Sequence, residues 1–238
     1  MNIAILGYGK MGKIIEKMAT ERGHSVPLKV GREGFVASDL DDIDVAIDFS
    51  LPSVAFENIT ACLKAGVPVV SGTTGWLEKK PEVEALCKEV NGSFLYASNF
   101  SLGVNLFFAL NKHLANLMNP HDYRASMLEV HHTQKLDAPS GTAITLAEDL
   151  IDNSDSLSSW KLVEKNEDAE KGELPIRAER VDPTPGTHVI NYSSEIDDIE
   201  IKHTAHNRNG FALGAVIAAE FLFENPGIQT MNNVLGLN

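Results

Sequence analysis

A glycine-rich turn near the start of the chain constrains the fold more than any other feature. Residues Gly7-Tyr8-Gly9-Lys10-Met11-Gly12 have the spacing G-x-G-x-x-G, between an apolar run at 2–6 and a helical pattern at 10–22. In this strand–turn–helix setting the first glycine permits a tight turn, the second lets the backbone approach a pyrophosphate, and the third allows close helix–strand packing. The sequence therefore predicts a dinucleotide site here; a glycine-rich turn without a ligand is the alternative.

The turn opens a series of alternating strand and helix patterns. Short runs rich in Val and Ile predict strands at 2–6, 25–30, 45–49, 67–72 and 93–98, and helical patterns lie between them. Such repeated units with apolar strands indicate a parallel sheet covered by helices on both faces. We expect an α/β fold with an N-terminal Rossmann-like dinucleotide-binding domain.

The pattern changes after residue 101. A long helix is predicted at 103–117, a strand at 127–132, a helix at 139–151, a polar surface loop at 153–173 and three strands within 176–205. This grouping indicates a C-terminal α+β domain with a mixed sheet. The apolar helix at 210–224 is expected to be buried against the first domain. The predicted domains are therefore 1–101 with 212–238, for the dinucleotide, and 102–211, for the substrate.

Composition excludes several classes of function. The chain has 238 residues, 43% of them hydrophobic and 22% charged, as in an ordinary globular protein. It contains no apolar run near the roughly 20 residues of a membrane span and no secretory signal, so we expect a cytoplasmic protein with no membrane association. A net charge of −13 argues against nucleic-acid binding. Cys62 and Cys87 have no metal-ligand spacing and are expected to be small core residues.

Cofactor preference depends on the end of the second strand, where dinucleotide folds usually place an acid for the ribose hydroxyls. Gly31 stands at that position and Arg32 follows it. An arginine without the acid suits a 2′-phosphate, which predicts that NADPH binds at least as well as NADH. Arg32 as a solvated loop charge, or Glu33 as a displaced acid, are the alternatives.

Two further loops follow predicted strands at the edge where this fold binds ligands. Small and hydroxyl-bearing residues in them are predicted to approach the nicotinamide ribose and carboxamide. Turns that contact no ligand are the alternative. The predicted cofactor residues in these loops are Gly72, Thr73 and Thr74 in the first, and Ala97, Ser98, Asn99 and Phe100 in the second.

The segment from Glu129 to Ala143, EVHHTQKLDAPSGTA, gathers proton donors ahead of a helix start. His131 and His132 end a predicted strand and should point to opposite sides. Asp137 is expected to cap the following helix and Pro139 to lie in its first turn. The first-turn N–H groups of Ser140, Gly141 and Thr142 would then be free to bind a carboxylate. With Lys135 nearby, the segment predicts a site for an anionic substrate that is protonated.

This segment resembles the E-x-H-H-x-x-K-x-D-A-P-S-G-T-A signature of the 4-hydroxy-tetrahydrodipicolinate reductase family, also called dihydrodipicolinate reductase, of the diaminopimelate and lysine pathway. The resemblance extends over nearly the whole chain. It also covers Gly7–Gly12, Asp48-Phe49-Ser50, Gly72-Thr73-Thr74-Gly75, Asn99-Phe100-Ser101, Gly103-Val104-Asn105, Arg180 and Gly186-x-His188.

The resemblance implies hydride transfer from NADH or NADPH to C4 of a conjugated cyclic imine dicarboxylate. It implies that His131 is the proton donor and acceptor, Lys135 a second proton donor, and His132 with Ser140–Thr142 the ligands of the substrate carboxylates. Arg180 belongs to a looser motif and is left out of the assigned set. The resemblance further implies a homotetramer formed through the second domain, and no metal.

The sequence departs from the family in the cofactor region. The glycine turn is one residue shorter than the common G-x-x-G-x-M-G form, and Gly31 replaces the usual acid. Two other functions fit parts of the sequence. A different two-domain dehydrogenase of a small dicarboxylate such as aspartate would explain the fold but not the histidine–lysine segment, and a non-catalytic dinucleotide sensor would need an effector region that the sequence does not offer.

Overall fold

The computed structural model describes residues 1–164 and 167–237. Contacts along the chain divide it into two compact units. Unit 1 comprises Met1–Asn105 and Asn209–Asn238, and unit 2 comprises Leu106–Arg208. In the sequence, unit 2 is therefore inserted between the two segments that form unit 1.

Unit 1 is built on a six-stranded parallel sheet, as a Rossmann-like domain requires. Its strand order is β11-β5-β4-β3-β1-β2. The chain runs from β1 outward to β2 and then returns to the other side of β1 as β3, so the carboxyl ends of β1 and β3 flank the switch point where this fold binds ligands. The strands are β1 (Asn2–Leu6), β2 (Ser25–Val30), β3 (Val45–Asp48), β4 (Val69–Ser71), β5 (Phe94–Tyr96) and β11 (Ile228–Gln229).

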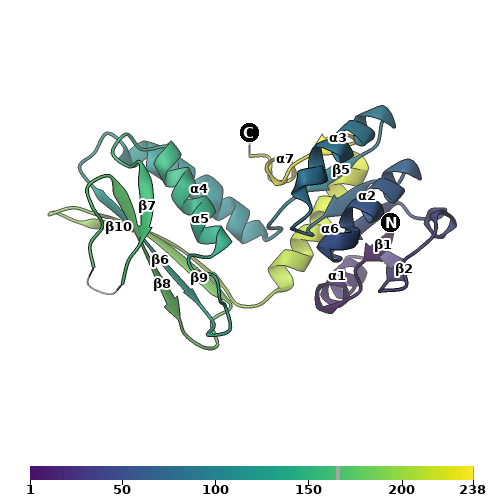
Figure 1. The fold of residues 1–238 in the computed structure, drawn as a ribbon, viewed down its shortest axis with the longest axis horizontal. Coiled ribbons are helices and arrows are strands. Elements are labelled where there is room, and N and C mark those ends of the chain that lie inside the picture. Colours follow the sequence, from purple (N-terminus) through teal and green to yellow (C-terminus); the bar gives the residue numbers. More distant parts are fainter. Residues whose placement is uncertain (165–166, 238) are drawn as a thin grey trace. The chain divides into compact units, whose positions relative to one another are not determined.

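Helices cover both faces of this sheet, each over its own apolar core (Figure 1). One face carries α1 (Lys10–Glu21), α6 (Asn209–Glu224) and α7 (Met231–Leu235). The other carries α2 (Pro52–Lys64) and α3 (Lys80–Glu89), where Cys62 and Cys87 are buried. Burial raises the pKa of the Cys62 thiol to about 12, as expected of a core residue. Two short 3₁₀ helices, η1 (Ala37–Leu40) and η2 (Leu77–Lys79), complete the unit.

Helix α6 approaches the sheet closely because its inner face is made of small residues. It packs on α1 and on β3, β4 and β5, and most of its buried side chains are alanines. At Gly214 the approach is tightest, since a Cβ there would lie 1.7 Å from the carbonyl oxygen of Phe100. Only glycine fits at this point of the helix without moving the backbone of the neighbouring segment.

Unit 2 has a mixed five-stranded sheet with the order β10-β9-β6-β8-β7, which confirms the predicted fold class. Strands β6, β9 and β10 pair antiparallel, whereas β6, β8 and β7 pair parallel. Helices α4 (Leu102–Met118) and α5 (Gly141–Asp152) lie over one face and share its core (Figure 1). The strands are β6 (Arg124–His131), β7 (Ser159–Leu162), β8 (Glu173–Arg180), β9 (Gly186–Ser193) and β10 (Asp198–Ala205).

The prediction of a surface loop at 153–173 was wrong in part, because the segment contains strand β7. Among the described residues this strand is at the edge of the sheet and pairs only with β8, with Ser159 and Leu162 exposed. An edge strand with a polar sequence carries no alternating apolar signal, so the local pattern could not reveal it. Lys165 and Asn166 of the predicted loop lie outside the described residues.

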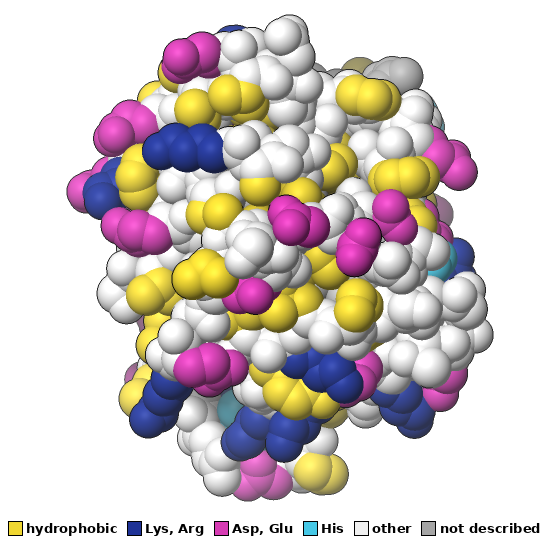
Figure 2. Space-filling view, turned by 90° about the vertical axis from the view of Figure 1, so that its right-hand side faces the viewer, with side chains coloured by type: hydrophobic (Ala, Val, Ile, Leu, Met, Phe, Trp, Pro, Cys, Tyr) yellow, Lys and Arg dark blue, Asp and Glu magenta, His cyan; other side chains and the backbone are white. Residues whose placement is uncertain are grey.

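The surface agrees with an acidic protein. On the face drawn in Figure 2, acidic side chains are spread among apolar ones, and Lys and Arg gather toward the lower edge. Within the described part of the chain, no helix has the length and apolar character needed to cross a membrane.

The contact at Gly214 predicts a measurable loss of stability for G214A. The added methyl group meets a backbone carbonyl, so we expect the unfolding free energy to fall by about 1–3 kcal/mol, the usual cost of overpacking, in spite of alanine's better helix propensity. Denaturant unfolding monitored by circular dichroism measures it.

The matched control is G210A in the same helix, where a Cβ would meet the Ser101 hydroxyl oxygen at an ordinary 3.5 Å. Equal midpoints for G214A and G210A would contradict the close approach of α6.

Candidate active site

The glycine-rich turn has the shape that a dinucleotide pyrophosphate requires. Gly7 has φ +96°, and a Cβ on it would lie 2.2 Å from the carbonyl oxygen of Phe49. A Cβ on Gly12 would lie 2.6 Å from the carbonyl oxygen of Gly7, so this glycine allows α1 to pack against the turn. At Gly9, which precedes the first turn of α1, a Cβ would meet nothing within 4 Å. The space beside Gly9 is therefore open, which fits a phosphate bound at the N-terminus of α1.

The other residues predicted in this turn differ in their surroundings. The Tyr8 hydroxyl donates a hydrogen bond to Glu16, whose carboxylate also pairs with Lys29. Lys10 is exposed, and Met11 packs partly against the core on the α1 face. Tyr8 is thus held by the protein, and the backbone of the turn is the part left to contact a phosphate.

At the end of β2 the structure places a carboxylate after all. Glu33 folds back so that its Oε1 accepts a hydrogen bond of 2.6 Å from the Gly31 N–H, and this bond lowers the pKa of Glu33. Arg32 is exposed beside it. The strand end therefore offers both an acid, at the position where dinucleotide folds bind the ribose hydroxyls, and a cation suited to a 2′-phosphate.

The two further loops contain both buried and accessible residues. The Thr73 hydroxyl is buried, donating to Asp48 Oδ2 at 2.8 Å and accepting from the Ser50 N–H at 2.9 Å. Thr74 is exposed, and Gly72 lies under the Phe49 ring, where a Cβ would come within 2.4 Å. The Thr73 side chain is therefore committed to the protein interior.

In the second loop the predicted residues again separate by exposure. Phe100 is buried against the Phe49 ring, with 5.7 Å between centroids. Asn99 accepts a hydrogen bond from the Ser101 N–H, Ala97 is half-buried and Ser98 is exposed. Among these residues Ser98 is the one whose side chain is most open to solvent.

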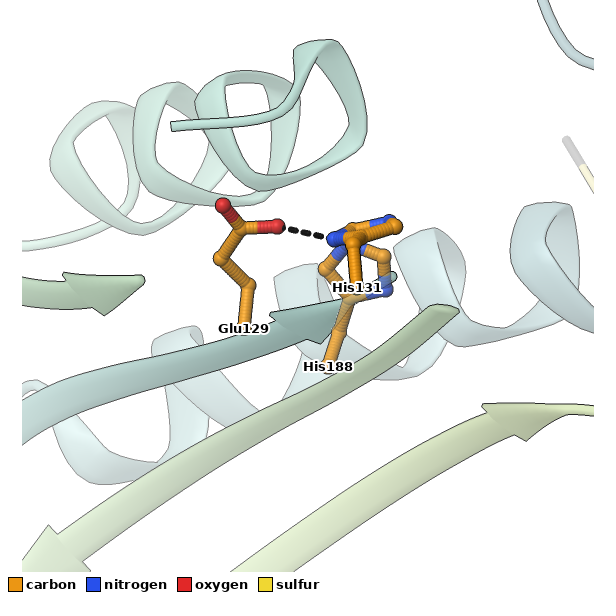
Figure 3. A group of neighbouring side chains, drawn as sticks. All are labelled: Glu129, His131 and His188. Atoms are coloured by element: carbon orange, nitrogen blue, oxygen red, sulfur yellow. Dashed lines mark ion pairs between the residues drawn. The ribbon is translucent and has the colours of Figure 1, made fainter. Parts of the chain in front are cut away.

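In unit 2 the candidate site forms where β6 and β9 meet. Glu129 and His131 are two residues apart on β6, so the alternation of the strand places both on the face covered by helices. His188 on β9 is the cross-strand partner of Glu129. Figure 3 shows the three side chains converging on this face, with the carboxylate of Glu129 directed at the His131 ring. The rings of His131 and His188 meet edge-on, 5.2 Å apart.

Glu129 is completely buried and carries the negative charge of this cluster. One oxygen, Oε2, forms an ion pair with His131 Nδ1. The other, Oε1, accepts hydrogen bonds from Arg180 Nη2 at 3.0 Å and from the Ser140 N–H at 3.3 Å. Burial alone would raise the pKa of Glu129, but the hydrogen bonds from His131 and Arg180 outweigh it and lower the pKa to about 2. The carboxylate is therefore ionised at neutral pH and orients the imidazole of His131.

Two neighbours shape the space around His131. Gly186 at the start of β9 faces its outer nitrogen, and a Cβ there would come within 3.0 Å of Nε2. His188 lies against the edge of the His131 ring. Its own Nε2 is 3.1 Å from the Ser140 hydroxyl oxygen. Burial, followed by the charge of His131, lowers the pKa of His188 to about 4. His188 is thus a neutral ring that supports His131.

Helix α5 starts two residues later than predicted. Helix α5 begins at Gly141, and its N-cap is Ser140, whose hydroxyl accepts from the Ala143 N–H at 3.2 Å. The predictions that Asp137 caps the helix and that Pro139 lies in its first turn were therefore wrong. Of the N–H groups that were predicted to bind a carboxylate, that of Ser140 is instead buried and donates to Glu129. Gly141 is exposed and Thr142 half-buried, so their N–H groups stand at the accessible end of the helix.

Asp137 instead pairs with Lys135. The ammonium of Lys135 donates to both carboxylate oxygens of Asp137, at 2.9 and 2.8 Å, and this contact lowers the pKa of Asp137. Arg180 braces the same loop by donating to the carbonyl oxygens of Lys135 and Asp137. His132, just beyond the strand, is half-buried. The loop that carries Lys135 is thus tied to Glu129 through Arg180.

Sequence reasoning left three residues of this cluster unassigned. Glu129 and His188 stood in the quoted motifs without a role, and Arg180 was set aside as belonging to a looser motif. The spacing of Glu129 and His131 at alternate positions of one strand was visible in the sequence. The pairing of β6 with β8 and β9, which brings Arg180 and His188 to them, was not. The nearest ligand atoms of Glu129, His131 and His188 lie within 4.8 Å, which a metal ion could span. Both Glu129 oxygens, however, already have cationic or N–H partners within the protein.

The fold and these clusters define a two-unit dinucleotide-dependent oxidoreductase. Comparison with known proteins identifies the family. The family model for the N-terminus of dihydrodipicolinate reductase matches residues 1–100, and that for its C-terminus matches residues 103–235. The chain belongs to the dihydrodipicolinate reductase family.

Individual relatives agree. The chain is 52% identical to the 4-hydroxy-tetrahydrodipicolinate reductase of Christiangramia forsetii, over 99% of this chain and 98% of the relative. It is 33% identical to the enzyme of that name from Methanosarcina barkeri, over the full length of both. Its fold is similar to that of a dipicolinate-bound dihydrodipicolinate reductase from Paenisporosarcina, with a TM-score of 0.76, 24% identity and 97% of each chain covered.

The depressed pKa of His188 predicts a loss of stability in mild acid. The unfolded chain binds a proton at this histidine below its ordinary pKa of 6.5, whereas the folded chain does so only near 4, so acid favours unfolding between these values. Glu129 destabilises the fold in the same way only at lower pH, between its ordinary pKa of 4.5 and its folded-state pKa of about 2. We therefore expect the thermal midpoint of H188Q to fall less than that of the wild type between pH 7 and pH 4.5.

The thermal midpoint of H188Q should still fall somewhat in acid, because burial also lowers the pKa of His203. H113Q, at an exposed position of α4, is the control. Parallel curves for the wild type and H188Q would show that His188 is not held neutral.

Proposed function

We propose that the chain reduces 4-hydroxy-tetrahydrodipicolinate, by way of dihydrodipicolinate, to tetrahydrodipicolinate in diaminopimelate and lysine biosynthesis. The observation that carries this proposal is the buried Glu129 carboxylate paired with His131 beside the N-terminus of α5. It places an oriented imidazole next to backbone donors suited to a carboxylate. Membership in the family supports the reaction.

The substrate is a cyclic dicarboxylate, and the second unit offers matching cationic and N–H groups. The N–H groups of Gly141 and Thr142 at the start of α5 suit one carboxylate, because a helix N-terminus carries unpaired donors and a partial positive charge. Ser140 contributes as the N-cap of this helix, since its own N–H already donates to Glu129. His132 and Lys135 are proposed to contact the carboxylates as well. Arg180 contributes indirectly, since its donors are already used by Glu129 and by the Lys135 loop.

Reduction of the conjugated C=C–C=N system needs a hydride at one end and a proton at the other. The reduced dinucleotide supplies the hydride when bound. We assign the proton to His131 Nε2, because Nδ1 is held by Glu129 and the glycine at 186 leaves room beside the opposite nitrogen. The Glu129 carboxylate stabilises the protonated imidazole and fixes its orientation. Lys135, held by Asp137, is the proposed second proton donor.

The proposed cofactor site lies in unit 1. The glycine turn, Arg32 and the accessible parts of the loops at 72–74 and 97–100 are proposed to bind NADPH or NADH. Glu33 at the end of β2 suits the ribose hydroxyls of NADH, and Arg32 the 2′-phosphate of NADPH, so use of both cofactors is expected. We further propose a cytoplasmic homotetramer, as the family resemblance implies.

Coupled turnover tests the function. Dihydrodipicolinate synthase supplies fresh substrate, and oxidation of NADPH and of NADH is followed by absorbance. We expect oxidation of both cofactors that depends on the synthase and is inhibited by 2,6-pyridinedicarboxylate. Oxidation of NADPH or NADH with the keto analogue of aspartate and ammonia instead would favour another dicarboxylate dehydrogenase, and no oxidation of either cofactor would overturn the proposal.

Replacement of the proton donor gives a sharper prediction. H131Q should lower kcat by about 10²–10⁴-fold, the usual contribution of a positioned acid or base, while the Kd for NADPH stays within about twofold. Steady-state kinetics and fluorescence titration of the cofactor measure the two quantities. H113Q, on the exposed side of α4, controls for the loss of a histidine, and a wild-type kcat in H131Q would remove His131 from this role.

A further inference from the structure

A second buried carboxylate, Asp48, lies at the carboxyl end of β3 in unit 1 and is not used by the proposed chemistry. Its side chain is fully buried. It lies at the end of the sheet formed by the carboxyl ends of its strands, where β1 and β3 flank the switch point, next to the loops proposed to bind the dinucleotide. A buried carboxylate is costly unless its oxygens are satisfied, so its partners indicate what it is for.

Four neutral groups donate to Asp48. Oδ1 accepts from the Ser50 hydroxyl at 2.6 Å and from Asn58 Nδ2 at 3.2 Å. Oδ2 accepts from the hydroxyls of Ser71 at 2.9 Å and Thr73 at 2.8 Å. Among the residues that the structure describes, no cation pairs with it, and burial raises the pKa of Asp48 although each of these hydrogen bonds lowers it. The carboxyl group is therefore surrounded by hydroxyl and amide dipoles from several chain segments.

These partners join two loops that the sequence keeps apart. Ser50 follows β3, whereas Ser71 and Thr73 belong to the end of β4 and the loop after it. Thr73 closes the connection, because its hydroxyl donates to Asp48 and accepts from the Ser50 N–H. The backbone from residue 48 to 50 is thereby fixed relative to the loop at 72–74.

Phe49, between Asp48 and Ser50, extends this connection to the glycine turn. Its carbonyl oxygen would lie 2.2 Å from a Cβ on Gly7, and its ring would lie 2.4 Å from a Cβ on Gly72. Both glycines therefore pack directly on Phe49, one from the turn after β1 and one from the loop after β4. A shift of the 48–50 segment would move both loops together.

We propose that Asp48 is a positioning residue for dinucleotide binding, which holds the 72–74 loop and the glycine turn in register through Ser50, Thr73 and Phe49. This rests on the proposed function only in taking a nicotinamide dinucleotide as the ligand. Asp48 does not touch the cofactor in this role. Its carboxylate sets the positions of the backbone groups that do.

The test measures cofactor affinity directly. D48N keeps the volume but places an amide N–H₂ among groups that already donate, so the loops lose at least one hydrogen bond. We expect the Kd for NADPH, from fluorescence titration, to rise about tenfold, the factor that corresponds to one neutral hydrogen bond. T73V removes the connecting hydroxyl at nearly constant shape and should raise the Kd by a similar factor, and the double variant should show less than the product of the two effects.

If Asp48 contributed only to stability, D48N would lower the thermal midpoint and leave the Kd for NADPH unchanged. D149N is the matched control, because Asp149 is also a buried aspartate but lies on α5 and pairs with Lys112. We expect D149N to keep the wild-type Kd whatever its thermal midpoint. A lowered midpoint with a wild-type Kd in D48N would overturn the inference, and T73V decides it in the same way if D48N does not fold. Failure of the wild type to bind NADPH or NADH would instead overturn the proposed function, and the inference with it.

Discussion

The arrangement of the candidate site depends on one buried negative charge. Glu129 has no access to solvent, so its charge must be balanced within the fold. His131, Arg180 and the Ser140 N–H supply that balance, and each comes from a different place in the chain. Because Arg180 also binds the loop of Lys135, the charge of Glu129 fixes the strand end, the loop and the start of α5 together.

A comparison of the two buried carboxylates shows how environment decides the role of a side chain. Glu129 is paired with cations, and its pKa is lowered to about 2. Asp48 is surrounded by neutral donors, and burial raises its pKa. The first therefore behaves as a fixed negative charge that can stabilise a protonated histidine. The second acts as a common acceptor that joins loops without attracting a cation.

The sequence predicted the parts of the molecule whose signal is local. Apolar strands such as Asn2–Leu6, the glycine turn and the histidine–lysine segment have patterns that short-range physics explains. The polar edge strand Ser159–Leu162 and the two-residue strand Ile228–Gln229 exist because of partners far away in the chain, so their own sequences gave no sign of them.

The site shows the same limit. His131 was predicted from its neighbours in sequence, but its contacts with Glu129 and His188 depend on the register of β6 against β9. Ser140, rather than Asp137, caps α5, because Asp137 is drawn to the ammonium of Lys135. Likewise the Thr73 hydroxyl, expected at a cofactor surface, is taken up by Asp48 and Ser50. In each case a competing long-range partner decided the outcome.

The late position of α6 in the chain has a consequence for biosynthesis. One face of the first sheet is completed by residues of this helix, yet 106–208 are translated before it. During synthesis on the ribosome, the apolar side chains of β1, β3 and β4 on that face wait for residues 209–224 to leave the exit tunnel. The interposed unit has all its own strands by then and can fold first. The dinucleotide unit can therefore complete its core only after the interposed unit has been translated, and until then the uncovered face of its sheet is the surface that a chaperone would have to shield.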